Sequence, residues 1–228
     1  MLILACDTSN STCCAGLYED GKELMSELNN SGRTHSETFM PIVDKIVKES
    51  GKDYKDIDAV AVTVGPGSFT GIRIGLSAVK GLCLAIGKPC IPVSSTKALA
   101  LSVENITAEE KDSVFIPCFD ARNNRVFASV RGGDGYSELI EEGAYDADNL
   151  AAKAKPYLEG KTVFLLGNGA DTMQKALEGT GADIQNAKGC VILPKGVYKA
   201  SEGIEPRSAA GVGAVYCAVS SAERLKKQ

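Results

Sequence analysis

Histidine is almost absent from this chain of 228 residues, which contains only His35. Every metal-binding motif that needs two histidines, including His-Glu-x-x-His and His-x-x-x-His, is therefore excluded. His35 lies where a helix is expected to begin, and the positive end of that helix favours the neutral imidazole. A lone histidine in this position is more typical of a structural or interface residue than of a general base.

Basic charge is also in short supply. The chain has 25 lysines and arginines against 29 aspartates and glutamates, which leaves a net charge of −4. Such a chain gains little from counterion release on nucleic acid, and its basic residues are not interleaved with aromatic ones. The composition therefore argues against a protein that binds RNA by itself.

Long apolar runs and paired-cysteine motifs are missing as well. We find no stretch of about 18 uncharged apolar residues of the kind that spans a membrane. The first seven residues form a short apolar run without a basic segment, which predicts a strand rather than a signal peptide. The eight cysteines include the neighbours Cys13 and Cys14 but no Cys-x-x-Cys pair. Several lie inside apolar runs, so we expect reduced, buried thiols and a cytoplasmic protein.

Periodicity in the first 104 residues predicts an alternation of strands and helices. Asp20-Gly21, between two strand-like runs, predicts a tight hairpin. The predicted strands are 2–6, 12–18, 22–28, 59–64 and 90–93. The first predicted helix begins at 36, the second spans 68–86, and the third runs from 95 to about 104.

The same order recurs after a polar stretch at 105–112. The predicted strands are 114–119, 125–131, 136–141, 162–166 and 190–193, and the predicted helices are 146–158, 170–178 and a last one from 206 or 208 to 225. We therefore predict an α/β protein of two tandem RNase H-like lobes, 1–104 and 105–228, each a mixed five-stranded sheet with helices. This is the architecture of sugar kinases, actin and the Hsp70 chaperones. The last helix is expected to pack back on the first lobe.

Two turns and one glycine pair are candidates for a nucleotide site. In this architecture, phosphates bind between two turns that each open with an aspartate, where a carboxylate can hold Mg²⁺ through water. Neither turn contains the glycine that lets backbone approach phosphate, and each aspartate could instead cap its own turn. The glycine pair before a helix suits a phosphate or simply a tight turn. The residues of this vestigial nucleotide site would be Asp7, Thr8, Ser9, Asp120, Gly167 and Gly169.

The predicted helix 68–86 is apolar on two faces. It follows a glycine block that lacks the lysine of a P-loop and a carboxylate for a general base. Within the helix only Arg73 and Lys80 are charged. A surface helix needs one apolar face, so either this helix is buried on both sides or its second face packs on another chain. One stripe contains Ile72, Leu76, Val79, Cys83 and Ile86, and the other, made mostly of small residues, contains Ile74, Ala78, Gly81 and Ala85.

Four stretches together resemble the bacterial TsaB (YeaZ) family of tRNA threonylcarbamoyladenosine biosynthesis proteins, in the glycoprotease-like branch of the sugar kinase, Hsp70 and actin superfamily. The resemblance covers the whole chain and is densest in the first 125 residues. The stretches are Asp7-Thr8-Ser9, Thr34-His35-Ser36-Glu37 with Met40-Pro41, the block from Gly65 to Leu76, and Asp120-Ala121-Arg122.

The resemblance implies a non-catalytic subunit that pairs with and activates TsaD. That larger paralogue transfers threonylcarbamoyl to adenosine 37 of tRNAs that read ANN codons, and it uses a metal held partly by a His-x-x-x-His pair. The family further implies an ATPase subunit, TsaE, in the complex, contact with tRNA only through the complex, a homodimer when the chain is alone, and no membrane. We expect no metal and no cofactor beyond weak ATP or ADP binding.

In this family the pairing surface is formed by two helices of the first lobe, here about 36–50 and 68–86. The alternative to a non-catalytic subunit is an enzyme, an ATP-dependent small-molecule phosphotransferase that uses the two aspartate turns in an interlobe cleft. The residues that the resemblance and the stripe pattern place at the interface are His35, Phe39, Met40, Val43, Val47, Phe69, Ile74, Ala78, Gly81 and Ala85.

Overall fold

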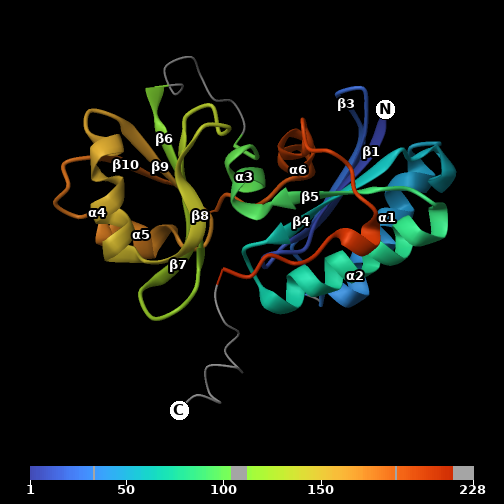
Figure 1. Cartoon of the computed structure of the whole chain (residues 1–228), viewed down its shortest axis with the longest axis horizontal. Helices are drawn as coiled ribbons and strands as arrows, with labels where there is room; N and C mark the ends of the chain where they lie inside the picture. The colour runs from blue at the N-terminus through green and yellow to red at the C-terminus, as the bar shows by residue number, and fades with distance from the viewer. Residues whose placement is uncertain (33, 104–111, 188, 218–228) are drawn as a thin grey trace, which may run out of the picture.

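Two lobes with the same sheet order make up the protein. The computed structural model describes residues 1–32, 34–103, 112–187 and 189–217. The first sheet has the strand order β3-β2-β1-β4-β5 and the second β10-β9-β6-β7-β8, which is the same order written from the opposite edge (Figure 1). The predicted α/β fold with two mixed five-stranded sheets is therefore confirmed.

The first sheet begins as an antiparallel meander and continues in parallel. Asp20 and Gly21 both adopt positive φ in the turn between β2 and β3, as the predicted hairpin requires. Strands β1 and β4 are buried along their whole length, because helices cover both faces of the sheet. The strands are β1 (Leu2–Asp7), β2 (Cys13–Glu19), β3 (Lys22–Asn29), β4 (Ala59–Gly65) and β5 (Cys90–Ser94).

Helices α1 (His35–Glu49) and α2 (Phe69–Ile86) lie side by side on the outer face of this sheet (Figure 1). Both follow a 3.6-residue apolar period, and their inward side chains form one core cluster with β1, β2 and β4. Ser68 accepts a hydrogen bond from the Gly71 N–H as the N-cap of α2, and Gly87 ends the helix in the left-handed conformation. A 3₁₀ turn, η1 (Tyr54–Asp56), leads into β4.

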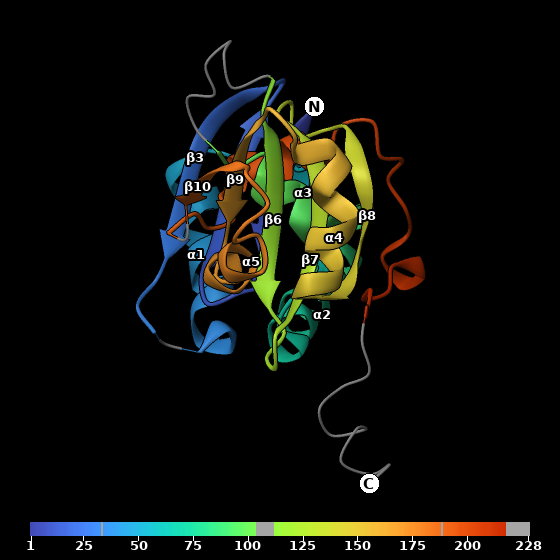
Figure 2. The same ribbon diagram turned by 90° about the vertical axis from the view of Figure 1, so that its left-hand side faces the viewer.

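The second lobe has the same arrangement of a five-stranded sheet covered by helices, but its helices are shorter. Figure 2, in which this lobe faces the viewer, shows α4 (Ala147–Leu158) and α5 (Ala170–Ala176) in front of the sheet and α3 (Ser95–Ala100) behind it. The Asp146 side chain caps α4 by accepting from the Asn149 N–H. The strands are β6 (Val114–Asp120), β7 (Arg125–Gly132), β8 (Glu138–Asp146), β9 (Thr162–Leu166) and β10 (Asp183–Ala187).

An apolar cluster between the two sheets joins the two lobes. Helices α3 and α6 (Pro194–Ser201) pack between the sheets, where Ile3 and Ala5 of β1 share one apolar cluster with Phe115 and Phe119 of β6. Tyr198 of α6 stacks on Tyr18 of β2 with ring centroids 4.5 Å apart. The lobes are therefore held together by a dry core as well as by the connecting chain.

Three elements differ between the prediction and the structure, two of them in the C-terminal quarter. The fifth strand of the second sheet is β10, not 190–193; β10 is a polar edge strand whose side chains give no apolar signal. Helix α6 was missed, although Pro194 at its first turn is a favoured helix start. Helix α3 ends at Ala100 rather than near 104.

The long helix predicted from 206 or 208 to 225 is wrong over its described part. Residues 206–217 contain only the 3₁₀ turn η3 (Ala209–Gly211) and extended chain; residues 218–225 of that prediction lie outside the described residues. Arg207 pairs with Cys90 of β5, and the Val215 N–H donates to Val64 O at 2.7 Å. These sheet-like bonds to the first lobe compete with a helix. The segment lies along the first lobe, on which the last helix was expected to pack, but as extended chain.

Candidate functional site

The turn after β1 is organised around the buried carboxylate of Asp7. Its Oδ1 accepts hydrogen bonds from the Ser9 N–H at 3.0 Å, the Ser9 hydroxyl at 2.6 Å and the Thr63 hydroxyl at 2.5 Å. Burial raises the pKa of Asp7, while these bonds and the nearby His35 lower it in part. The carboxylate caps its own turn, which is the structural alternative raised from the sequence.

The glycine block after β4 closes over this turn. The Ser68 N–H donates to Ser9 O at 2.7 Å, and the Thr8 hydroxyl donates to Gly71 O at 2.8 Å. A Cβ atom on Gly71 would lie 2.1 Å from Thr8 O. Helix α2 can approach so closely only because glycine stands there, and the turn is packed against the chain's own backbone rather than open to a phosphate.

Two further glycines show the same close approach. A Cβ atom on Gly67 would lie 2.3 Å from Ser9 O, and one on Gly75 would lie 2.1 Å from Thr8 Oγ1. The conspicuous glycine block therefore has a packing role along the whole start of α2.

The equivalent turn after β6 is exposed. The Arg122 N–H donates to Asp120 Oδ1 at 2.8 Å, and the Asp120 N–H donates to the Asn168 side-chain oxygen at 3.1 Å. Gly167 and Gly169 lie against the end of β6, where a Cβ atom on Gly167 would be 2.5 Å from Cys118 O. The structure thus brings Asp120, Gly167 and Gly169 together at one sheet edge, and tight packing explains both glycines.

No metal site is evident in the part of the chain that the structure describes, since it contains no group of three or more His, Cys, Asp or Glu side chains that could hold an ion. The lone histidine, His35, is half-buried at the first residue of α1. Its Nε2–H donates to the Asn10 carbonyl at 2.6 Å. This bond ties the start of α1 to the β1–β2 turn, which is a structural role.

A buried polar network that the sequence did not reveal joins the lobes. Glu142 of β8 accepts hydrogen bonds from the hydroxyls of Ser94 and Thr96 and from the Thr96 N–H. Burial raises the pKa of Glu142, while these hydrogen bonds and Arg131 lower it in part. The Ser129 hydroxyl donates to Thr96 Oγ1 at 3.1 Å and accepts from Arg131 Nε at 3.0 Å. Glu142 and Ser129 lie at least 33 residues along the chain from Ser94 and Thr96, so no local sequence signal could have predicted these contacts between them.

Helix α2 has one buried and one open face, and these follow the two stripes read from the sequence. Ile72, Leu76, Val79 and Cys83 are buried in the first core cluster. On the other face Ile74 and Ala78 are half-buried, Gly81 and Ala85 are exposed, and a Cβ atom on Gly81 would meet nothing within 4 Å. Leu84 beside this stripe is 84% exposed. The helix therefore presents an apolar surface that its own lobe leaves uncovered.

By length and composition alone α2 could cross a membrane, and it is the one such helix among the described residues. This is weak evidence for a span, because the core helix of an α/β domain has the same composition. Here the helix packs on β4 and α1.

Three predicted interface residues of α1 are buried in the core of their own lobe. Phe39, Val43 and Val47 are at most 2% exposed and fill the core cluster beneath the helix. The apolar period that suggested them is the period of the face that packs on the sheet. Met40, by contrast, is exposed on the outer side of α1.

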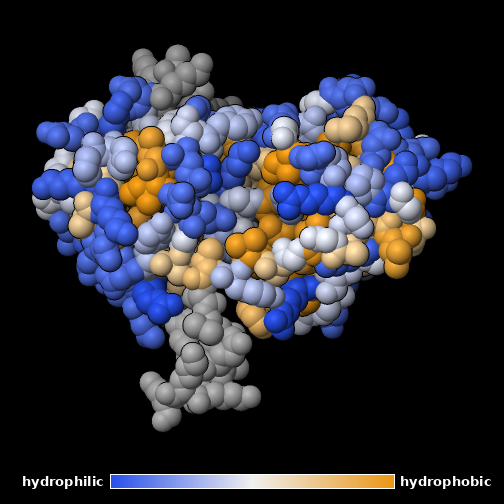
Figure 3. Space-filling model, in the orientation of Figure 1, coloured by the Kyte–Doolittle hydropathy of each residue, from blue (hydrophilic) through white to orange (hydrophobic). Residues whose placement is uncertain are grey.

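An aromatic cluster at the start of α2 was also missed by the sequence. The Arg73 guanidinium lies 3.8 Å from the centroid of the Phe69 ring, and Arg73 Nε–H donates to the Tyr216 hydroxyl at 2.8 Å. Phe69 and Tyr216 pack with centroids 4.9 Å apart and both remain exposed. Figure 3 shows apolar surface on this face of the first lobe, around α2 and the C-terminal segment. Tyr216 comes from the segment predicted as helix, so its position depended on the tertiary fold.

The fold and its two aspartate turns define the class: a two-lobed α/β protein whose two mixed five-stranded sheets have the same strand order. A family model described as TsaD, tRNA N6-adenosine threonylcarbamoyltransferase, matches residues 29–226. The chain belongs to the TsaB branch of this family, whose members are tRNA threonylcarbamoyladenosine biosynthesis proteins.

Individual relatives agree with this assignment. The TsaB protein of Haemophilus influenzae is 31% identical over 202 residues, which cover 82% of each chain, and that of Bacillus subtilis is 28% identical over 193 residues, covering 84% of this chain and 80% of the relative. The solved structure of YeaZ from Pseudomonas aeruginosa superposes with a TM-score of 0.77 at 22% identity and covers 94% of this chain and 99% of its own, which shows that the fold is shared.

Proposed function

We propose that this chain is a non-catalytic subunit that pairs through α1 and α2 with the catalytic paralogue, TsaD, to make threonylcarbamoyladenosine at position 37 of tRNA. The observation that carries the proposal is the open face of α2. An 18-residue helix buries one stripe in its own lobe and leaves Gly81, Leu84 and Ala85 uncovered. Burying a leucine that is 84% exposed contributes about 2 kcal/mol, so this surface favours association.

Small residues on this face allow two helices to approach closely. Helix axes pack 8–10 Å apart depending on the side chains at the contact, and glycine and alanine permit the short end of that range. The aromatic cluster of Phe69, Arg73 and Tyr216 lies at the N-terminal end of the same helix, and arginine and tyrosine are residue types enriched in binding hot spots. The same face would support a homodimer when the partner is absent.

The absence of catalysis in this subunit is part of the proposal. It is supported by the single histidine, which cannot supply a His-x-x-x-His pair, and by the closed turn at Asp7. The same closure disfavours the alternative of an ATP-dependent phosphotransferase, because that enzyme needs both turns open to phosphate. TsaE and tRNA would then join only in the assembled complex.

The test is a pairing measurement on an arginine variant of the open face. Ala85→Arg is preferable to Ala78→Arg, because Ala85 is exposed whereas Ala78 also packs against the core. Burying an unpaired charge in the contact should cost about 3 kcal/mol, which corresponds to a roughly 100-fold rise in the dissociation constant for TsaD. Light scattering coupled to gel filtration, with TsaD from the same organism, measures it.

Ala152→Arg is the matched control, since Ala152 is an exposed helical alanine on α4 of the other lobe. This variant should pair as the wild type does. If Ala85→Arg pairs normally while remaining folded, the open face of α2 is not the interface and the proposal fails.

A further inference from the structure

The charges on α2 are all positive, although the chain as a whole is acidic. The helix contains Arg73 and Lys80 but no aspartate or glutamate, and Lys88 follows directly after its C-cap. These are the three basic residues of this surface. The neighbouring segment 208–217 adds no charged residue. Because the net charge of the chain is −4, the open side of α2 is a local reversal of sign.

The three basic residues are not neutralised by the chain's own carboxylates. On the adjacent helix α1, Lys45 pairs with Glu27 at 2.6 Å, and Lys48 is likewise paired within the helix. None of the ion pairs formed between residues that the structure describes includes any of the three basic residues. Unpaired positive groups around an apolar surface complement a partner surface that carries negative charge.

The guanidinium of Arg73 is held in one position by aromatic side chains. It lies 3.8 Å from the centroid of the Phe69 ring, and its Nε–H donates to the Tyr216 hydroxyl at 2.8 Å. Within the described part of the chain, its two terminal nitrogen atoms have no acceptor. A guanidinium fixed in this way loses little conformational freedom when both terminal groups bind one carboxylate.

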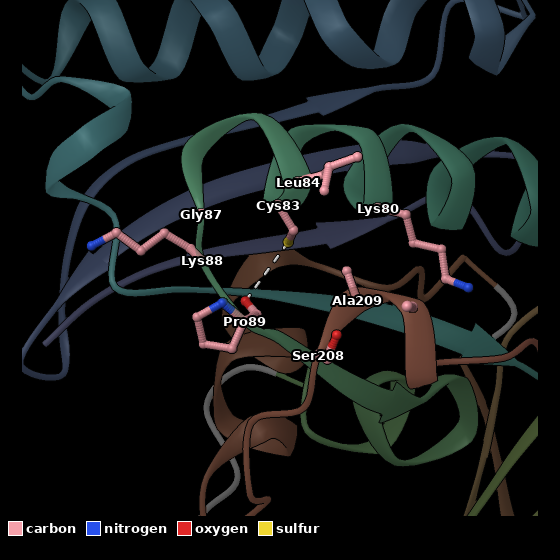
Figure 4. A pocket seen from close by; sticks show the side chains of 9 residues that line it. Lys80, Cys83, Leu84, Gly87, Lys88, Pro89, Ser208 and Ala209 are labelled. Carbon is pink, nitrogen blue, oxygen red and sulfur yellow. Dashed lines mark hydrogen bonds between the residues drawn. The ribbon is translucent and has the colours of Figure 1, made fainter.

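An apolar groove continues this surface at the C-terminal end of α2 (Figure 4). Its volume is about 540 Å³, and it lies between α2 and the segment that contains η3. Leu84, which is 84% exposed, lines the groove together with Ala209, while Lys80 and Lys88 extend at opposite ends of it (Figure 4). None of the described residues that line it is acidic. The groove can therefore hold an apolar side chain with positive charge on both sides.

A second copy of this chain complements the surface poorly. Self-pairing through α2 sets the basic residues of one copy against the same residues of the other, and like charges across a contact are unfavourable. We therefore expect a homodimer to be the weaker of the two pairings that this face supports.

Ribonucleic acid is also a poor match. A phosphate backbone would neutralise the three basic residues but would leave Leu84 and the apolar groove uncovered. Three such contacts also fall short of the roughly 6–10 phosphate contacts that give a protein strong binding to nucleic acid. The combination of apolar groove and basic rim is better suited to a protein segment.

We propose that the open face of α2 and the groove bind an amphipathic helix of the partner that carries an apolar stripe flanked by carboxylates. An apolar side chain of that helix enters the groove beside Leu84, and its carboxylates meet Arg73 and Lys80. Since these two residues lie about two helical turns apart, or ~10 Å, two acids at the same spacing on the partner match them. This inference rests on the proposed function and adds to it the chemistry of the partner's surface.

Ser77 is the place to test the sign of the partner's charge, because it is exposed on α2 one turn from both Arg73 and Lys80. Ser77→Glu repels the partner's carboxylates and should raise the dissociation constant for TsaD about five-fold, whereas Ser77→Lys should lower it about three-fold. Surface plasmon resonance at low salt, with TsaD from the same organism and without tRNA, measures both.

Folding stability should move in the opposite direction, which separates binding from a structural effect. A glutamate at position 77 attracts the basic residues one turn away on its own helix, and a lysine there repels them. The free Ser77→Glu variant should therefore melt at a higher temperature than Ser77→Lys. Ala152→Glu and Ala152→Lys, on α4 of the other lobe, change the net charge equally and should leave the affinity for TsaD unchanged.

Ionic strength provides a second measurement. The association rate constant of the wild type should fall about five-fold as the salt concentration rises from about 0.05 M to about 0.3 M, because screening weakens the attraction between the two surfaces. Ser77→Glu should show a smaller fall.

Equal affinities of the two Ser77 variants, or a tighter complex with Ser77→Glu, would overturn the proposal. So would a difference between them that appears only after tRNA is added, since the basic residues would then serve nucleic acid. A homodimer tighter than the complex with TsaD would overturn it as well.

Gly81→Gln distinguishes this failure from that of the proposed function. The change is neutral, and a Cβ atom on Gly81 meets nothing within 4 Å, so the variant should fold. Its bulk on the open face should weaken pairing with TsaD about ten-fold whatever the partner's charge. If Gly81→Gln weakens pairing but the Ser77 variants are equal, only the acidic partner helix is wrong. If Gly81→Gln pairs normally, the proposed pairing through α2 fails too.

Discussion

The turns that end β1 and β6 occupy equivalent places in the two lobes but differ in what surrounds them. Asp7, Thr8 and Ser9 are at most 1% exposed, and the backbone of α2 lies directly on them. Asp120 is exposed, and the residues after it form a projecting turn in which Arg122, Asn123 and Asn124 all have positive φ. The turn after β1 is therefore part of the core of the first lobe, while the turn after β6 is open to solvent. In the first lobe the turn is covered by the start of α2, and the exposed apolar surface lies on the outer face of that helix.

The largest expected effect comes from breaking the closed turn with one methyl group. Gly71→Ala places a Cβ atom 2.1 Å from the Thr8 carbonyl oxygen, which is backbone and cannot rotate away. We expect the free energy of unfolding to fall by about 3 kcal/mol, measured by urea denaturation.

Gly81→Ala is the matched control in the same helix, because its Cβ atom meets nothing within 4 Å. It should raise the free energy of unfolding by roughly 1 kcal/mol through helix propensity. Equal stability of the two variants would mean that α2 does not rest on the turn.

A smaller effect should follow from removing the aspartate at each turn. Asp7→Ala leaves the Ser9 N–H and the Thr63 hydroxyl without their buried acceptor, so it should cost about 2 kcal/mol. Asp120→Ala, at the exposed turn, should change the stability by no more than about 0.5 kcal/mol. Thermal or urea unfolding of the pair compares them directly.

The buried charge of Asp7 adds a pH dependence that can be measured. Because burial raises the pKa of Asp7 in the folded state above 3.8, the folded protein binds this proton more tightly than the unfolded chain. The contribution of Asp7 to the free energy of unfolding should therefore rise as pH falls from neutral through the folded-state pKa towards 3.8. Asp7→Asn should abolish this rise and retain much of the turn, and an unchanged pH profile would contradict the assignment.

The smallest effect is expected at the open turn itself. Arg122→Gly relieves a positive φ of 62° in a residue that is not glycine, but it also increases the entropy of the unfolded chain. These terms nearly cancel, so we expect a change within about 0.5 kcal/mol by urea denaturation. A loss larger than 1 kcal/mol, beyond the typical range for surface substitutions, would show that the second turn is as tightly packed as the first.

The sequence predicted features that depend on neighbouring residues better than contacts between distant segments. The Asp20-Gly21 hairpin, the strand at 59–64 and the helix at 68–86 were predicted well, because alternation, apolar runs and capping residues act over a few positions. Strand β10 and helix α6 were missed, since β10 is polar and α6 is short and packs on the other lobe. The candidate site followed the same division: the two apolar stripes of α2 were predicted, while the Arg73–Tyr216 contact was not.

The sequence by itself determined the repeated order of strands and helices, the family, and the two apolar stripes of α2, because each depends on residues near one another in the chain. Only the tertiary structure decided which of those faces remained open and that the glycine block fills the first turn. It also decided that Phe39 and Val43 are core residues, and that the C-terminal segment is extended and places Tyr216 beside Arg73. These outcomes depend on burial and on hydrogen bonds between distant segments, such as the one between Arg73 and Tyr216, which are 143 residues apart, and such contacts exist only once the lobes have packed.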